Sequence, residues 1–160
     1  MEKELKNAVK IRFQDCDPFN HLNNSKYLDY FLNMREDQLI ENYDIDIYKH
    51  SENTGNGWII ASNQICYLKP ALANEKVLIV SKLIKYGKRT LNVEMIMWDE
   101  AQSEIKSIYW TQNIYFNTKT HKSVSHSTEL MKLFKETVVP TEQDYFEERC
   151  RFILRNSNQK

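Results

Sequence analysis

The sequence predicts an α+β fold in which a five-stranded antiparallel sheet curls around one long central helix. One strand-like segment precedes an amphipathic helix, and four strand-like segments follow it. Consecutive strands joined by short turns pair as antiparallel hairpins. Because the helix carries a wide apolar arc, we expect the sheet to cover it on most of its sides.

The first strand is predicted over residues 7–14, because Val9, Ile11 and Phe13 alternate with polar residues. Alternation of this kind places the apolar side chains on one face of a strand. Residues 15–23 are rich in short polar residues and contain a proline, so we expect them to form a loop.

The central helix is predicted from Asn24 or Ser25 to about Tyr43. Apolar side chains recur there at spacings of three and four, starting at Tyr27. Arg35 falls inside the apolar arc. A buried arginine needs a carboxylate or carbonyl partner, although its stem can equally lie along an apolar surface with the charge in water.

The four later strands are recognised by alternating or dense apolar residues between turn signals, and they are predicted over residues 58–68, 75–86, 89–98 and 104–117. Residues 44–57 are predicted to form a loop or short helix. One or two short helices are expected in residues 127–134 and 142–153. We therefore expect a single domain over residues 1–160, with a core of about residues 7–130 and a helical C-terminal tail.

Composition excludes several classes of function. The 22 basic and 22 acidic residues balance, which gives no electrostatic reason to bind nucleic acid or an anionic membrane. The sequence has no run of 18 apolar residues, so we expect no membrane-spanning helix. The first residues are too polar for a signal peptide. Three widely spaced cysteines favour a reducing cytoplasm over a disulfide framework, and the four histidines show no metal-ligand spacing.

The stretch from Asp15 to Arg35, DCDPFNHLNNSKYLDYFLNMR, places two carboxylates, a histidine and three asparagines directly before the helix. This pattern resembles the signature of the acyl-CoA thioesterases of the 4-hydroxybenzoyl-CoA thioesterase family. The resemblance implies the hotdog fold and hydrolysis of an acyl-CoA thioester to free acid and CoA, without a cofactor or metal. It also implies a homodimer or homotetramer with active sites at the subunit interface.

The same resemblance assigns the catalytic role to Asp17, the second aspartate of the pair, as nucleophile or general base. Free N–H groups at the helix start would stabilise the oxyanion. His21 is a candidate to hydrogen-bond Asp17 or to hold the attacking water, and Asn23 is a candidate to orient that water. Cys16 lies between the aspartates, but a free cysteine more often acts as a small apolar residue.

Four further residues are predicted to bind substrate. Asn20 stands where many relatives have glycine, and asparagine is the residue that best replaces glycine at positive φ. Asn24 is expected to cap the helix beside the substrate. Lys88 and Arg89, in the turn after Gly87, are predicted to meet CoA phosphates.

Three alternatives remain open from the sequence: a thioesterase acting on acyl-carrier-protein esters, a hotdog hydratase, and a non-catalytic acyl-binding protein. The hydratase pattern requires asparagine at Asp17 and a histidine one residue before His21. The acyl chain is also open, although Trp58, Tyr67, Trp98, Tyr109, Trp110 and Phe116 would suit an aromatic acyl group.

Overall fold

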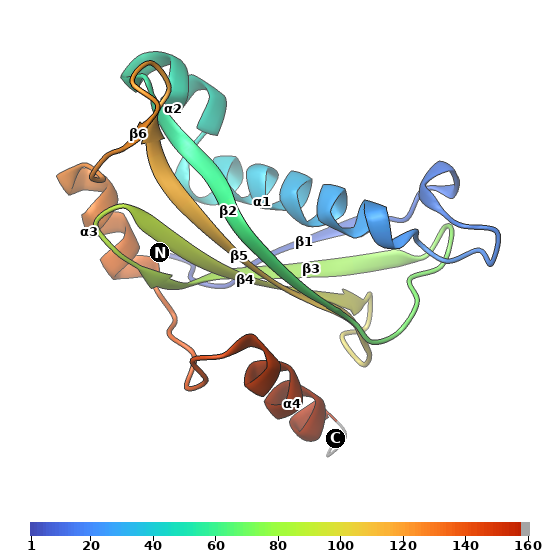
Figure 1. Ribbon diagram of the computed structural model, residues 1–160. Helices are drawn as coiled ribbons and strands as arrows, with labels where there is room; N and C mark the ends of the chain where they lie inside the picture. Colours follow the sequence, from blue (N-terminus) through green and yellow to red (C-terminus); the bar gives the residue numbers. More distant parts are fainter. Residues whose placement is uncertain (158–160) are drawn as a thin grey trace.

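In the computed structural model, which describes residues 1–157, a strongly curved antiparallel sheet wraps around one long helix (Figure 1). The elements in chain order are β1 (Leu5–Lys10), the 3-10 turns η1 (Phe13–Asp15) and η2 (Asn24–Lys26), α1 (Tyr27–Tyr43), α2 (Ile47–Thr54), β2 (Asn56–Tyr67), β3 (Lys76–Tyr86), β4 (Thr90–Asp99), β5 (Ile105–Asn117), β6 (Lys122–Ser123), α3 (Thr128–Thr137) and α4 (Phe146–Ser157). The predicted α+β class and hotdog arrangement are confirmed.

The strands are ordered β1-β3-β4-β5-β2, and the two-residue strand β6 adds to β5. Every pair is antiparallel. The long strands β1 and β2 therefore form the edges of the main sheet. A bulge at residue 61 interrupts the pairing of β2 with β5 without ending it.

The first strand differs from its predicted bounds, because it starts at Leu5 and ends at Lys10. Ile11 is buried as expected, but Phe13 is 79% exposed and begins a 3-10 turn. The apolar alternation therefore continued past the end of the strand. The short strand β6 was not predicted, since two residues carry no readable period.

The core lies between α1 and the concave face of the sheet. Tyr27, Tyr30 and Phe31 of the helix are buried there, and the ring of Phe31 stacks on Tyr109 with centroids 5.1 Å apart. The alternating positions of β3 and β4 supply the facing surface, and they include Val77, Ile79, Met95 and Met97, each 0% exposed.

A polar network crosses this core at the middle of α1. The side-chain amide of Gln38, itself 0% exposed, donates to the carbonyls of Leu5 (3.3 Å) and Ile79 (3.0 Å). The Ser81 hydroxyl donates to the Gln38 carbonyl oxygen, and Arg35 Nη1 donates to Ser81 Oγ at 2.9 Å. The network thus ties α1 to β1 and β3 while satisfying buried polar groups.

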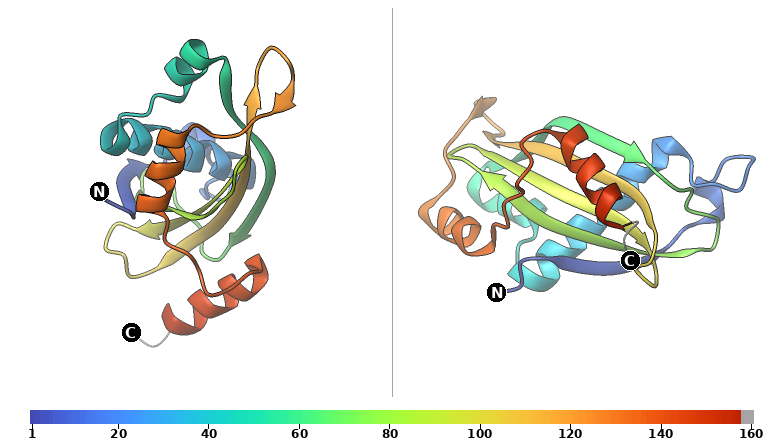
Figure 2. Two further views of the ribbon diagram at one scale, coloured as in Figure 1. Left: turned by 90° about the vertical axis from the view of Figure 1, so that its left-hand side faces the viewer. Right: turned by 90° about the horizontal axis from the view of Figure 1, so that it is seen from below.

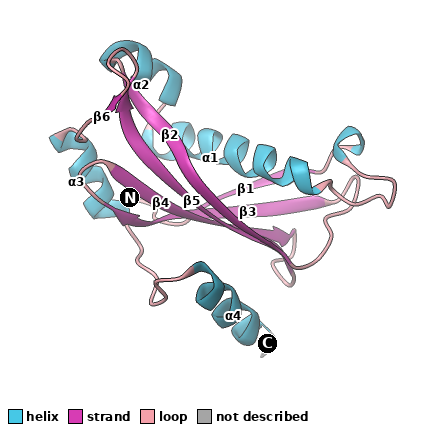
Figure 3. Ribbon diagram, viewed as in Figure 1, coloured by secondary structure: helices cyan, strands magenta, loops and turns pink. Residues whose placement is uncertain are grey.

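Helix α4 lies on the other face of the sheet, away from α1 (Figures 2 and 3). Its buried residues Phe146 and Cys150 form a second cluster with Ile105 and Ile108 of β5, and Trp98 and Trp110 lie at the margin of this cluster. The chain therefore covers both faces of its sheet.

A buried carboxylate fixes α4 in place. Glu94 is 1% exposed, and its two oxygens accept hydrogen bonds from Arg149 Nε (2.8 Å), Arg149 Nη2 (2.9 Å) and Trp110 Nε1 (2.8 Å). Lys82 Nζ lies 3.5 Å away. Burial alone would raise the pKa of Glu94, but the hydrogen bonds and charges of these partners lower it overall.

We predict that Glu94→Gln lowers the free energy of unfolding by about 2–3 kcal/mol, because Arg149 is left buried without its partner. Since the pKa of Glu94 is lowered by folding, its stabilisation is present above the unfolded pKa and is lost as pH falls through the folded pKa. Urea unfolding from neutral pH downward should therefore show the difference between wild type and variant shrinking in acid.

The control is Glu100→Gln, which removes an exposed ion pair in which Lys76 Nζ lies 2.6 Å from Glu100 Oε1. Such pairs contribute little, so this variant should unfold like the wild type. Equal losses in both variants, or a difference that grows in acid, would contradict the role of Glu94.

Candidate active site

The motif before the helix folds as a tight hairpin. Cys16 and Leu22 form an antiparallel bridge, the Asp17 N–H donates to the His21 carbonyl (2.8 Å), and the Asn23 N–H donates to the Asp15 carbonyl (2.9 Å). This pairing sets Asp17 opposite His21 at the closing turn.

Asn20 occupies the turn with a φ of 65°. The prediction that asparagine takes the positive φ of a glycine position is confirmed. The hairpin therefore keeps its turn without glycine.

Two sets of contacts anchor the hairpin to the rest of the fold. The Leu22 N–H donates to the Ala71 carbonyl (2.7 Å), which ties the hairpin to the connection between β2 and β3. The Tyr30 hydroxyl of α1 donates to Asp15 Oδ2 (2.7 Å) and accepts the Arg12 N–H (2.9 Å). Burial raises the pKa of Tyr30 to about 12, so it remains a donor, and Asp15 acts as an anchor.

The Asp17 carboxylate is divided between two tasks. Oδ1 accepts the backbone N–H groups of Phe19 (2.9 Å) and His21 (3.1 Å). Oδ2 accepts no hydrogen bond from residues 1–157, and the residue is partly exposed. One oxygen thus fixes the direction of the carboxylate, while the other is available to water or substrate.

His21 contacts Asp17 through its backbone and not through its ring. Its imidazole makes a tilted contact with Phe19, with centroids 6.4 Å apart, and makes no hydrogen bond within the described chain. Of the two roles considered for His21, the ring hydrogen bond to Asp17 is absent from the described chain, and the holding of the attacking water stays a prediction.

Asn23, and not Asn24, caps the start of the helical segment. Asn23 Oδ1 accepts the Ser25 N–H (2.9 Å) and the Ser25 hydroxyl (2.8 Å). The assignment shifted by one residue because a 3-10 turn precedes α1. The backbone N–H of Asn24 makes no hydrogen bond to any of residues 1–157, so it is available to a ligand at the positive end of the helix.

Cys16 is poorly suited to nucleophilic attack. Burial raises the pKa of its thiol, and the charges of Asp15 and Asp17 raise it further. The thiol instead donates to the Arg12 carbonyl at 3.4 Å.

Lys88 and Arg89 lie far from Asp17 within one chain. They occupy the turn between β3 and β4, beside α3, whereas the hairpin lies at the other end of the sheet (Figure 1). Both are exposed, and Arg89 Nη1 donates to Ser123 Oγ at 3.2 Å. They are therefore too far from Asp17 to serve the same site within one chain, and their contact with CoA phosphates stays a prediction. Lys106 lies nearer the hairpin, since its Nζ donates to the Pro70 carbonyl at 3.2 Å, but it is already paired with Glu75 at 2.9 Å and Glu104 at 3.2 Å.

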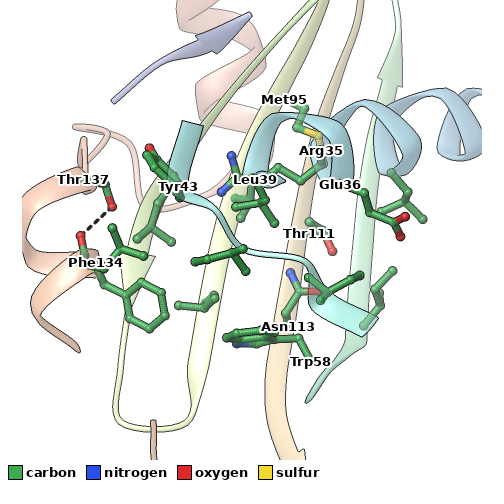
Figure 4. Close-up of a pocket in the computed structure, with 18 residues that line it drawn as sticks. Arg35, Glu36, Leu39, Tyr43, Trp58, Met95, Thr111, Asn113, Phe134 and Thr137 are labelled. Atoms are coloured by element: carbon green, nitrogen blue, oxygen red, sulfur yellow. Dashed lines mark hydrogen bonds between the residues drawn. The ribbon is translucent and has the colours of Figure 1, made fainter. Parts of the chain in front are cut away.

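A cavity of about 230 Å³ lies between the second half of α1 and the inner face of the sheet (Figure 4). Its walls are mainly apolar, and its lining does not include Asp17. Of the aromatic residues considered for an acyl pocket, Trp58 lines this cavity, whereas Tyr109 packs on Phe31 and Trp98 and Trp110 lie under α4.

Residues 1–157 contain no group of three or more His, Cys, Asp or Glu placed to hold a metal ion. None of their helices has the length and apolar character needed to cross a membrane.

The chain matches the thioesterase-like superfamily over residues 11–134. It is 22% identical over 134 residues to the long-chain acyl-CoA thioesterase FadM of Escherichia coli strain K12, covering 84% of this chain and 99% of FadM.

Solved structures show the same fold. The probable thioesterase YbaW from Escherichia coli superposes with a TM-score of 0.72 at 21% identity, covering 84% of this chain and 99% of YbaW. The protein SAV2348 from Staphylococcus aureus, solved in complex with CoA, superposes with a TM-score of 0.76 at 15% identity, covering 90% and 92% of the two chains. At these identities the likeness establishes the hotdog fold.

We predict that Asn20→Gly keeps near wild-type stability, whereas Asn20→Val costs about 1–2 kcal/mol because a β-branched residue strains at positive φ. Any turnover should fall with Asn20→Val, since the turn directs Asp17. Urea unfolding and initial rates measure the two effects.

Gln102 provides the matched control, because it also has a positive φ (55°) but lies in the turn between β4 and β5. Gln102→Val should lose similar stability and keep its turnover. An Asn20→Val protein as stable and active as wild type would show that the turn conformation is unimportant.

Proposed function

We propose that this chain, which belongs to the thioesterase-like superfamily, is an acyl-CoA thioesterase that releases a free acid and CoA. The observation that carries the proposal is the divided carboxylate of Asp17. Two backbone N–H groups hold Oδ1, and Oδ2 is available just ahead of a helix start whose Asn24 N–H is also available.

In the proposed reaction, Asp17 Oδ2 either takes a proton from water or attacks the thioester carbonyl itself. The carbonyl oxygen gains negative charge as the tetrahedral centre forms. The Asn24 N–H and the positive end of the helix would stabilise that charge. When the centre collapses, the C–S bond breaks and the sulfur takes a proton. In the general-base route the acyl carbon keeps the oxygen of the water and leaves as the free acid. In the nucleophilic route the acyl group is left as an anhydride on Asp17, which a water molecule then cleaves to the free acid and the Asp17 carboxylate.

The comparisons support CoA as the carrier of the acyl group. FadM is a long-chain acyl-CoA thioesterase, and SAV2348 was solved with CoA. The positive φ of Asn20 keeps the turn that glycine would form, which weakens the alternative of a non-catalytic acyl-binding protein. An acyl-carrier-protein ester remains the second candidate substrate.

We also propose that the active enzyme is a homodimer that pairs two copies of β2. This strand bonds to β5 on one side, and Ile59, Ile60 and Tyr67 are 44%, 42% and 42% exposed. A long apolar edge needs a partner, and a two-fold axis supplies one that covers the β2 edge of both copies.

In such a pairing the two β2 strands would run in opposite directions. The Tyr67 end of β2, where its hydroxyl donates to the Asn24 carbonyl (3.1 Å), would lie beside the Asn56 end of the partner's strand. The hairpin of one protomer would then face the end of the partner that holds the cavity and the turn with Lys88 and Arg89. This arrangement would restore the predicted role of those two cations across the interface.

We predict that Asp17→Asn reduces kcat for acyl-CoA hydrolysis by about 10²–10⁴-fold, because the amide can neither accept the proton nor attack. Thiol release from an aliphatic and aromatic acyl-CoA panel, followed with a thiol-reactive dye, measures this. Asp29→Asn is the control, since Asp29 in the first turn of α1 forms an exposed pair with Lys26 of η2 (3.2 Å). Turnover that survives in Asp17→Asn would place the chemistry elsewhere.

We predict that Ile59→Glu converts the dimer to a monomer and lowers turnover, because each copy would bring a carboxylate into the paired β2 edge without a cationic partner. Light scattering during gel filtration should give twice the 19.2 kDa chain mass for wild type. Tyr145→Glu places the same charge at an aromatic residue that is 68% exposed outside β2, and should stay dimeric. A monomeric wild type with full activity would exclude the proposed interface.

A further inference from the structure

Arg35 is a charged residue in the core that the proposed hydrolysis does not use. It projects from the apolar side of α1 and lines the cavity of about 230 Å³ (Figure 4). A guanidinium carries five N–H donors. In the described chain Arg35 makes one hydrogen bond, from Nη1 to Ser81 Oγ at 2.9 Å.

No carboxylate among residues 1–157 pairs with Arg35. Glu36 also lines the cavity, but its carboxylate accepts the Tyr48 hydroxyl at 3.3 and 3.4 Å. Tyr43 lies near the guanidinium, and its hydroxyl donates to the Glu2 carbonyl at 2.7 Å. The chain thus supplies a neutral hydroxyl where a buried cation normally has an anionic partner.

The guanidinium of Arg35 keeps its positive charge in this mainly apolar cavity. Burial lowers the pKa of Arg35 to about 10, so the guanidinium stays protonated at neutral pH. A partly buried charge without an anionic partner is costly, and an anionic ligand would offset that cost.

A second buried polar group, the Thr111 hydroxyl, faces the same cavity. Thr111 is 3% exposed, and its hydroxyl makes no hydrogen bond of ordinary geometry within the described residues. The hydroxyl does influence its neighbour, because burial raises the pKa of Tyr109 and Thr111 opposes that rise. Asn113 also lines the cavity, and its side chain hydrogen-bonds to none of residues 1–157.

The rest of the lining is mainly apolar, with Leu32, Leu39 and Met95 as examples. The volume lies below the roughly 300–1,000 Å³ of sites for drug-sized ligands. A slender chain with one anionic end suits such a cavity, whereas a hydrated nucleotide phosphate does not.

We propose that Arg35 binds a terminal carboxylate of the acyl group, so that the preferred substrates are CoA monothioesters of dicarboxylic acids. A guanidinium and a carboxylate form two parallel hydrogen bonds, and Thr111 and Asn113 are placed to add neutral ones. This inference rests on the proposed thioesterase function and names its substrate class.

The test compares CoA esters of equal carbon number that differ in the terminal group: hexanoyl and adipoyl, octanoyl and suberoyl, decanoyl and sebacoyl. In wild type, kcat/KM should favour at least one dicarboxylic ester about tenfold or more over its partner. Arg35→Met should lose about ten- to a hundredfold in kcat/KM for that ester, mainly through KM, and should keep or gain activity on the partner. Arg35→Lys should fall between.

Lys49→Met is the matched control, because Lys49 is 77% exposed on α2 and should leave both esters unaffected. A wild type that prefers the monocarboxylic member of every pair would overturn the proposal. Equal losses on both members in Arg35→Met would do the same, because they would indicate a structural role. If Arg35→Met fails to fold, the wild-type comparison alone decides.

A binding measurement separates this inference from the proposed hydrolysis. Calorimetry would titrate suberate and octanoate into wild type and Arg35→Met. If no CoA ester is cleaved but suberate binds wild type and not the variant, the carboxylate site stands and the thioesterase proposal falls. If no ester is cleaved and neither acid binds, both proposals fall.

Discussion

The fit of α1 into the concave face of the sheet is the constraint on which the other features depend. A helix with such a wide apolar arc can be covered only by a sheet that curves around it. Gln38 makes this fit specific, because its amide satisfies backbone carbonyls of two strands at a depth where an unmatched polar group is costly. The helix then separates two regions: its start holds the hairpin with Asp17, and its second half forms one wall of the cavity.

The sequence predicted the features that depend on the period and spacing of apolar residues or on the preference of a single residue. The helix over Tyr27–Tyr43 and the four later strands follow from apolar repeats, and positive φ at Asn20 follows from a property of asparagine itself. What it missed depends on three-dimensional placement. The hairpin at Asp17 is held by backbone bonds that any sequence could make, and the separation of Lys88 from that site follows from strand length and direction.

One buried charge and one partly buried charge, Glu94 and Arg35, differ in how far the chain itself supplies their partners. Glu94, on the outer face, is enclosed by donors from Arg149 and Trp110. Arg35, on the side of α1 that faces the cavity, hydrogen-bonds among residues 1–157 to the Ser81 hydroxyl alone. The donors around Glu94 satisfy its charge, and the docking of α4 explains why they are there. The charge of Arg35 lacks an anionic partner and lies beside a cavity, which indicates an anionic ligand that binds there. Sequence position alone does not distinguish the two, since both lie in apolar segments.

The placement of the tryptophans makes the intrinsic fluorescence of this protein informative about separate regions. Trp58 lines the inner cavity and stacks on His50, with centroids 4.9 Å apart. Trp98 and Trp110 lie on the outer face beneath α4, where Trp110 meets Phe146 edge-on at 5.7 Å. Emission from one indole therefore responds to what enters the cavity, and emission from the other two responds to release of the last helix. Replacing one tryptophan at a time with phenylalanine would resolve the two optical signals without an added label.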